Sequence, residues 1–128
     1  MPKTDPKALA EYMRVDDARN LEDYLLRFTT TLSVMQTAPA MERIAFELAE
    51  DAYNEGVRYL ETRFCPTLNV HGGLKIDEVV VAATEGLARA EKQYGIVGRA
   101  IVTALRNNSP SESLALAELA VDLSLIHI

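Results

Sequence analysis

The sequence is poor in the residues that build disulfides and metal sites. It has one cysteine, Cys65, and two histidines, His71 and His127, among 128 residues. One cysteine cannot form an internal disulfide, which excludes a disulfide-stapled secreted domain. Two histidines are too few for a typical catalytic zinc centre, which needs roughly three protein ligands. The sequence therefore predicts neither a disulfide framework nor a zinc site of its own.

Long apolar runs and basic runs are also missing. No apolar stretch approaches the ~20 residues of a membrane span, and residues 1–12 lack the basic and apolar regions of an export signal. Acidic residues outnumber basic ones by 19 to 13, which gives a formal net charge of −6. Such a surface has no electrostatic footprint for nucleic acid or for an anionic membrane. With 48% apolar and 25% charged residues, the composition predicts one globular unit in the cytoplasm with neither of these partners.

The first part of the chain has the hydrophobic spacing of helices. Asp5 followed by Pro6 is typical of a helix start, and Asn20 is placed to cap a second helix. A third helix is predicted from about Pro39 to Gly56, with an apolar side made of Met41, Ile44, Ala45, Leu48 and Ala52. In the second helix the apolar residues recur with a helical period, which predicts a face buried against other structure. They are Leu21, Tyr24, Leu25, Phe28, Leu32 and Met35.

The second part of the chain alternates strand and helix. Residues 57–64 are rich in β-forming side chains and Pro66 bars their continuation, so this segment is predicted as a strand. An amphipathic helix follows at 76–94, then a nearly continuous apolar strand at 99–105. A capping box opens a last helix at 109–122. The strand–helix–strand order predicts an α/β architecture with parallel strands.

Side chains that could take part in binding lie at the ends of both predicted strands. Cys65 follows the first strand, and Leu105 with Arg106 ends the second. In α/β folds, ligands bind beyond the carboxyl ends of the strands, so these positions are candidates on topology alone. Glu61 and Arg63 share one face of the first strand, and we expect them to form a structural ion pair there.

Four separated blocks resemble the adenosine deaminase family of metal-dependent aminohydrolases. They are LEDYLLRF (21–28), YLETRFCP (59–66), the glycine-bounded run at 73–96 and IVTALRNNSP (101–110). The resemblance implies a (β/α)8 TIM barrel that hydrolyses adenosine to inosine and ammonia at one zinc ion. The metal-binding His, Glu and Asp motifs of that family do not occur in this sequence. Because such barrels take ~250 residues, we expect residues 1–122 to be about half of one barrel domain.

The same resemblance implies which residues contact the substrate. The helix of Leu21, Tyr24, Leu25 and Phe28 corresponds to an apolar lid over the nucleoside pocket, although periodicity alone is equally consistent with a core helix. Cys65 corresponds to a small residue of the pocket wall, and Leu105 to an apolar pocket residue; barrel packing is the alternative for both. We expect an unreactive Cys65, since no base lies near it in the sequence. His71, in a turn-rich segment, is expected to be solvated.

The last six residues, LSLIHI, do not continue the family pattern. The DNA adapter common in transposase-made libraries, CTGTCTCTTATACACATC, encodes Leu-Ser-Leu-Ile-His-Ile, so we expect residues 123–128 to be a non-native tail. We also expect part of a barrel to leave strand edges unpaired and apolar helix faces uncovered.

The function that the resemblance implies is zinc-dependent deamination of a purine nucleoside by the intact enzyme. We expect no zinc binding and no turnover by this chain alone, because it carries lid and wall residues and no metal ligands. Two alternatives stay open at this point. One is an adenine deaminase, or another aminohydrolase of the same barrel that acts on an adenosine-like compound. The other is a non-catalytic half-barrel that serves as a binding module. The sequence gives no oligomeric state.

Overall fold

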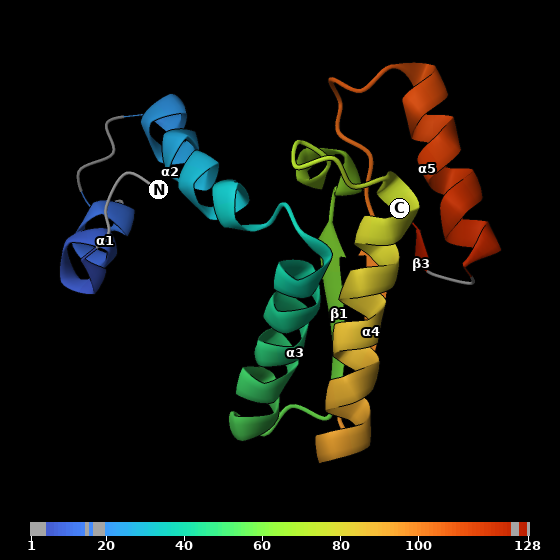
Figure 1. The fold of residues 1–128 in the computed structure, drawn as a ribbon, viewed down its shortest axis with the longest axis horizontal. Helices are drawn as coiled ribbons and strands as arrows, with labels where there is room; N and C mark the ends of the chain where they lie inside the picture. The colour runs from blue at the N-terminus through green and yellow to red at the C-terminus, as the bar shows by residue number, and fades with distance from the viewer. Residues whose placement is uncertain (1–4, 15, 17–19, 124–125, 128) are drawn as a thin grey trace.

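The computed structural model describes residues 5–14, 16, 20–123 and 126–127. Three helices precede a parallel sheet with helical connections (Figure 1). The elements are α1 (Pro6–Met13), α2 (Leu21–Val34), α3 (Ala38–Asn54), β1 (Tyr59–Phe64), the 3-10 helix η1 (Pro66–Asn69), α4 (Ile76–Tyr94), β2 (Val97–Val102), α5 (Pro110–Asp122) and β3 (Ile126–His127). The predicted order of helices, strand, helix, strand and helix is confirmed.

The sheet has the strand order β1-β2-β3, and both pairings are parallel. Tyr59 lies opposite Val97 and Phe64 opposite Val102, so α4 connects two neighbouring parallel strands. The predicted limits of both strands were wrong by a few residues. β1 starts late because the Val57 amide donates to a carbonyl of α3. β2 stops early because the Leu105 amide leaves the sheet and donates to the Asn108 side chain at 2.7 Å.

The third strand was not predicted. Ile126 and His127 pair with Ile101 and Val102, along the edge that β2 would otherwise leave open. An open strand edge presents unpaired amides and carbonyls, which accounts for the short pairing. The expectation that residues 123–128 are a non-native tail stays a prediction, and positions 124, 125 and 128 lie outside the described residues.

The main core lies where α3 and α4 pack together on one face of the sheet (Figure 1). Ile96 and Val79 are fully buried there. The predicted apolar side of α3 was wrong at Leu48, which is 43% exposed, while Ala49 is completely buried. The helix presents its small residues to α4 because the two backbones approach closely. A Cβ atom on Gly86 would lie only 2.2 Å from the Glu42 carbonyl oxygen.

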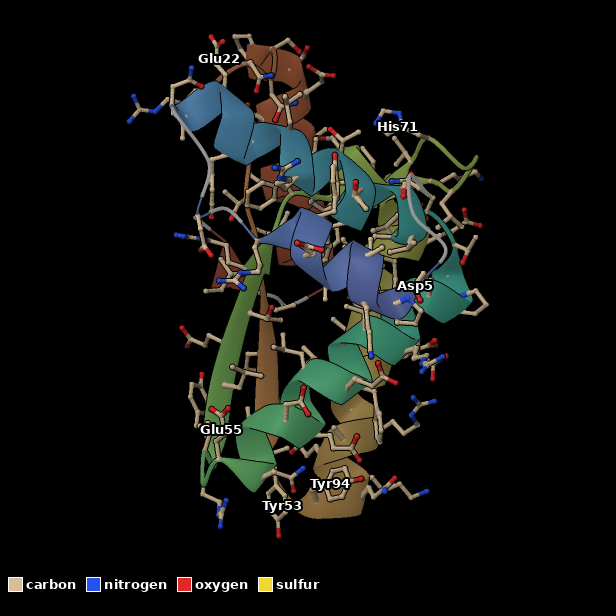
Figure 2. The ribbon with its side chains drawn as sticks, turned by 90° about the vertical axis from the view of Figure 1, so that its left-hand side faces the viewer. Asp5, Glu22, Tyr53, Glu55, His71 and Tyr94 are labelled. Atoms are coloured by element: carbon tan, nitrogen blue, oxygen red, sulfur yellow. The ribbon has the colours of Figure 1, made fainter. Side chains whose placement is uncertain are left out.

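Aromatic side chains join α3 and α4 at the end of the molecule opposite the carboxyl ends of the strands. The rings of Tyr53 and Tyr94 stack with their centroids 5.3 Å apart, and Figure 2 shows the two side chains next to each other. The Tyr94 hydroxyl donates a hydrogen bond to the Glu50 carboxylate, which raises the pKa of Tyr94 above its ordinary value. The Arg58 guanidinium lies over the Tyr53 ring, 4.8 Å from its centroid. These contacts fix the distal ends of the two helices.

The last helix begins with the predicted capping box. The Ser109 hydroxyl accepts from the Glu112 amide, and the Glu112 carboxylate accepts from the Ser109 amide at 2.7 Å. The Glu112 carboxylate accepts hydrogen bonds from the Ser109 amide and the Ser109 hydroxyl, which lowers the pKa of Glu112 from its usual 4.5. Leu116 and Ala120 then bury against Val80 and Val102, which forms a second, smaller core.

The capping box predicts an acid-dependent loss of stability. A carboxyl group with a depressed pKa in the folded state stabilises the fold above its unfolded pKa, and this contribution is lost as pH falls through the folded pKa. We therefore expect Glu112→Gln to lower the urea midpoint near neutral pH and to have no effect well below the depressed pKa. Glu118→Gln, on the same helix, is the control for charge. An equal effect of Glu112→Gln at both pH values would contradict the assignment.

Candidate functional site

The predicted lid residues lie on α2, and they are exposed. Leu21, Tyr24, Leu25 and Phe28 expose 68, 41, 49 and 46% of their surface. The prediction of a buried stripe was wrong for these four residues, because α2 has no extensive contact with any strand or other helix of the described residues. The other two predicted members, Leu32 and Met35, are half-buried, and Met35 packs against the main core. The outcome agrees with the expectation that a partial barrel leaves apolar helix faces uncovered. We call the four exposed residues the lid stripe.

Two residues of the lid stripe form the wall of a hollow between α1 and α2. The rings of Tyr24 and Phe28 meet edge to face, with centroids 5.4 Å apart. The hollow, of about 230 Å³, is lined by Met13, Tyr24, Arg27, Phe28 and Thr31. The Arg27 guanidinium lies over the Tyr12 ring, 4.4 Å from its centroid. Aromatic rings beside a planar cation favour a flat, apolar or π-rich partner. Leu21 and Leu25 do not line this hollow.

Cys65 and Leu105 come together at the carboxyl ends of the strands. The Cys65 side chain is buried, and its sulfur lies 3.0 Å from the Thr67 hydroxyl oxygen and 3.9 Å from the Asn108 side-chain oxygen. The same Asn108 oxygen accepts a hydrogen bond from the Leu105 amide. Asn108 therefore bridges the loops that follow β1 and β2. Leu105 is half-buried and lies three residues beyond the last residue of β2, in that second loop.

Asn108 was not among the predicted site residues. The residue stands just before the Ser109 cap, where an asparagine side chain commonly bonds backbone of its own turn. The bond of Asn108 to its own turn could have been predicted from neighbouring residues. Its contact with Cys65 could not, because the two positions lie 43 residues apart.

The two groups of predicted site residues lie on the same side of the molecule. Figure 1 shows α2 and the loop before α5 both beyond the carboxyl-terminal end of β1. Within the described part of the chain, no hydrogen bond or ring contact joins the lid stripe to Cys65 or Leu105. Tyr24 therefore contacts Phe28, and Asn108 links Cys65 to Leu105, but no such contact joins these two pairs in the described part of the chain.

The predicted ion pair on β1 was wrong. Glu61 and Arg63 are both exposed, and the Glu61 carboxylate accepts a hydrogen bond from the Tyr59 hydroxyl at 2.8 Å. This bond raises the pKa of Tyr59. The prediction assumed a covered sheet face, but in this chain the face that carries Tyr59, Glu61 and Arg63 is open. An ion pair between two solvated side chains contributes little free energy, so Glu61 and Arg63 gain little by pairing on an open face.

His71 and the acidic residues give no metal site. His71 is exposed, as predicted, and Figure 2 shows it pointing away from the body of the chain. Across residues 5–14, 16, 20–123 and 126–127, no three His, Cys, Asp or Glu side chains lie close enough together to hold a metal ion. The described residues therefore do not fit a catalytic zinc ion. None of the described helices is long and apolar enough to cross a membrane.

Comparisons with known proteins give the family. The family model for adenosine deaminase matches residues 1–125. An adenosine deaminase of Vibrio atlanticus is 47% identical over 103 residues, which are 80% of this chain and 31% of that protein. An adenosine deaminase of Clostridium botulinum is 42% identical over 108 residues, 84% of this chain and 33% of that protein. The chain thus spans about a third of the length of the curated relatives it matches.

Solved structures give the fold. An adenine deaminase of Arthrobacter aurescens matches with a TM-score of 0.79 and 21% identity, over 98% of this chain and 37% of that chain. An amidohydrolase of Burkholderia ambifaria, solved with bound zinc, matches with a TM-score of 0.63 and 28% identity, over 68% of this chain and 24% of that chain. The parallel strands with their connecting helices are thus part of a (β/α)8 barrel, as predicted. The chain belongs to the adenosine deaminase family.

Proposed function

We propose that this chain is the lid and two-strand part of a zinc-dependent adenosine deaminase. The observation that carries the proposal is the exposed lid stripe on α2, which lies on the side of the sheet where barrel enzymes bind their substrates. The stripe is apolar, partly aromatic and exposed. Such a surface can pack against a flat purine on one side and against the rest of the barrel on another. The intact enzyme would convert adenosine to inosine and ammonia.

In this proposal the lid stripe and the strand ends bind substrate and exclude water. Tyr24 and Phe28 offer ring edges and faces to the purine, and Leu21 and Leu25 extend the apolar cover. Cys65 and Leu105 form the wall at the carboxyl ends of β1 and β2, with Asn108 holding their loops together. Excluding water strengthens every electrostatic interaction inside a site, which favours nucleophilic attack on the purine.

The zinc ion belongs to the intact enzyme in this proposal, since the described residues do not fit one. When bound, zinc supplies an activated water as the nucleophile. The zinc of the Burkholderia ambifaria amidohydrolase supports a metal in relatives of this fold. The acidic composition and the single cysteine support a cytoplasmic location for the enzyme, and a small purine nucleoside is its proposed partner.

Adenosine is favoured over adenine because the curated relatives at 42–47% identity are named adenosine deaminases. The adenine deaminase of Arthrobacter aurescens shares the fold at 21% identity, which carries no substrate assignment. The lid stripe agrees with a substrate larger than a free base, since it offers apolar cover beyond the ring pair Tyr24 and Phe28.

A substrate panel tests the proposal. We expect the longer protein that contains this sequence to release ammonia from adenosine, to prefer adenosine to adenine, and to lose activity when a chelator removes zinc. The isolated chain is the matched control, and we expect it to deaminate nothing and to bind no stoichiometric zinc. Preference for adenine would favour the adenine deaminase alternative. No reaction with either compound would favour the binding module, and turnover by the isolated chain would contradict our assignment of residues.

A further inference from the structure

The base of α2 is held by side-chain hydrogen bonds to the loop after β1. The Gln36 side-chain nitrogen donates to the Leu68 carbonyl at 2.9 Å, and the His71 amide donates to the Gln36 side-chain oxygen at 2.9 Å. The buried Asn69 side chain donates to the Met35 carbonyl at 2.9 Å. Three hydrogen bonds therefore join two segments that lie more than 30 positions apart in the sequence. We call them the base clamp.

Gln36 also ends the helix. Its side-chain nitrogen donates a second bond, of 2.8 Å, to the Leu32 carbonyl in the last turn of α2. The same Leu32 carbonyl also accepts the Met35 backbone amide at 3.0 Å, so the side-chain bond adds a second donor at the helix end. One amide group thus links the final turn of α2 to the neighbouring loop through both of its polar atoms.

The loop is shaped to receive Gln36. A Cβ atom on Gly72 would lie 2.4 Å from the Gln36 carbonyl oxygen and 3.1 Å from its Cβ. Only glycine allows the loop backbone to pass this close. The next residue, Gly73, has a φ of +96°, a conformation that other residues rarely adopt. The close approach and the hydrogen bonds occur at the same point of the chain.

Toward α1, α2 is held by the stacking of Arg27 on Tyr12; toward the sheet, the base clamp is its main described attachment. Its lid stripe is exposed and it has no extensive contact with the strands or with another described helix. In contrast, the base clamp is anchored on buried structure, because Asn69 and Pro66 are buried in η1 and η1 packs against α4. The orientation of the lid stripe is therefore set at its base.

We propose that Gln36 and Asn69 are positioning residues, which set the direction of the lid stripe through the base clamp. The effect on substrate rests on the proposed function, because it requires that the lid stripe contacts the nucleoside. The clamp itself does not, because it is a property of this chain. Loss of either side chain frees the base of α2 while the core of α3, α4 and the sheet keeps its packing.

Hydrogen exchange in this chain tests the clamp. We expect Gln36→Ala to speed amide exchange about tenfold in α2 and in the loop at 66–73, since it removes two bonds of the base clamp, each worth about threefold in an opening equilibrium. Exchange in α3 and α4 should stay unchanged. Asn69→Ala should affect the same two segments. The control is Gln93→Ala, which removes the same group from a hydrogen bond to Tyr94 at the far end of α4. Unchanged exchange in α2, or equal acceleration in every helix, would overturn the clamp.

Kinetics of the longer protein test positioning. We expect Gln36→Ala to raise KM for adenosine by about tenfold with a change in kcat of less than about threefold, because a misdirected lid weakens binding before it affects chemistry. A purely structural role would lower the active fraction and leave KM unchanged, and that result would overturn the positioning role. If the longer protein does not act on adenosine, the proposed function fails while the exchange result still decides the clamp.

Discussion

Replacing Gly86 by valine is expected to lower the free energy of unfolding by about 3 kcal/mol, because added atoms cannot be accommodated where two helix backbones touch. A Cβ atom at this position would lie 2.2 Å from the Glu42 carbonyl oxygen and 3.0 Å from the Ala45 Cβ. A backbone carbonyl inside α3 cannot rotate away as a flexible side chain does. The change therefore forces α3 and α4 apart and disturbs the core that the two helices share.

Urea denaturation of the variant and of Ala88→Val measures this effect. Ala88 lies two residues further along α4, and it is exposed, so its substitution tests the cost of a β-branched residue in the helix alone. We expect that control to lose less than about 1 kcal/mol. Equal losses in the two variants would contradict the close packing of α3 on α4.

Replacing Leu116 by alanine is expected to cost about 3 kcal/mol, because the side chain is nearly completely buried and leaves a cavity. Leu116 exposes 2% of its surface in the small core with Val80, Val102 and Ala120. This core joins α5 to α4 and β2, so the loss should also loosen the helix. Far-UV circular dichroism during urea denaturation would show it as a lower midpoint.

Leu114 provides the matched control. It lies on the same helix and is 60% exposed, so Leu114→Ala makes the same chemical change where little apolar surface is buried. We expect a loss of less than about 0.5 kcal/mol. If both leucines cost the same, α5 does not dock through the second core.

The sequence predicted those elements whose signals are local. The helix α4 was predicted with its observed limits, because a long amphipathic pattern is followed by Gly95, which adopts a φ of +76°. The capping box of α5 was also predicted from the sequence, since the Ser109 and Glu112 side chains each accept a hydrogen bond from the other residue's backbone amide. Helix ends of this kind depend on neighbours three residues apart and on nothing distant.

The failures concern contacts between distant parts of the chain. Periodicity placed Leu48, and not Ala49, on the apolar side of α3, whereas the close packing of α3 on α4 at Gly86 buries Ala49. The exposure of the lid stripe depends on the absence of a covering partner, which a hydrophobic pattern cannot report. The base clamp pairs Gln36 with a loop 32 residues away, and no local spacing indicates it.

The central claim is that the lid stripe contacts the nucleoside, and two adjacent leucines test it. Leu25 belongs to the stripe, whereas Leu26 is 62% exposed and lies on another side of α2. In the longer protein, we expect Leu25→Ala to raise KM for adenosine about tenfold, since burying a leucine side chain is worth roughly 1.5–3 kcal/mol. Leu26→Ala should leave KM within about twofold. Equal KM values for both variants and the wild type would contradict the claim.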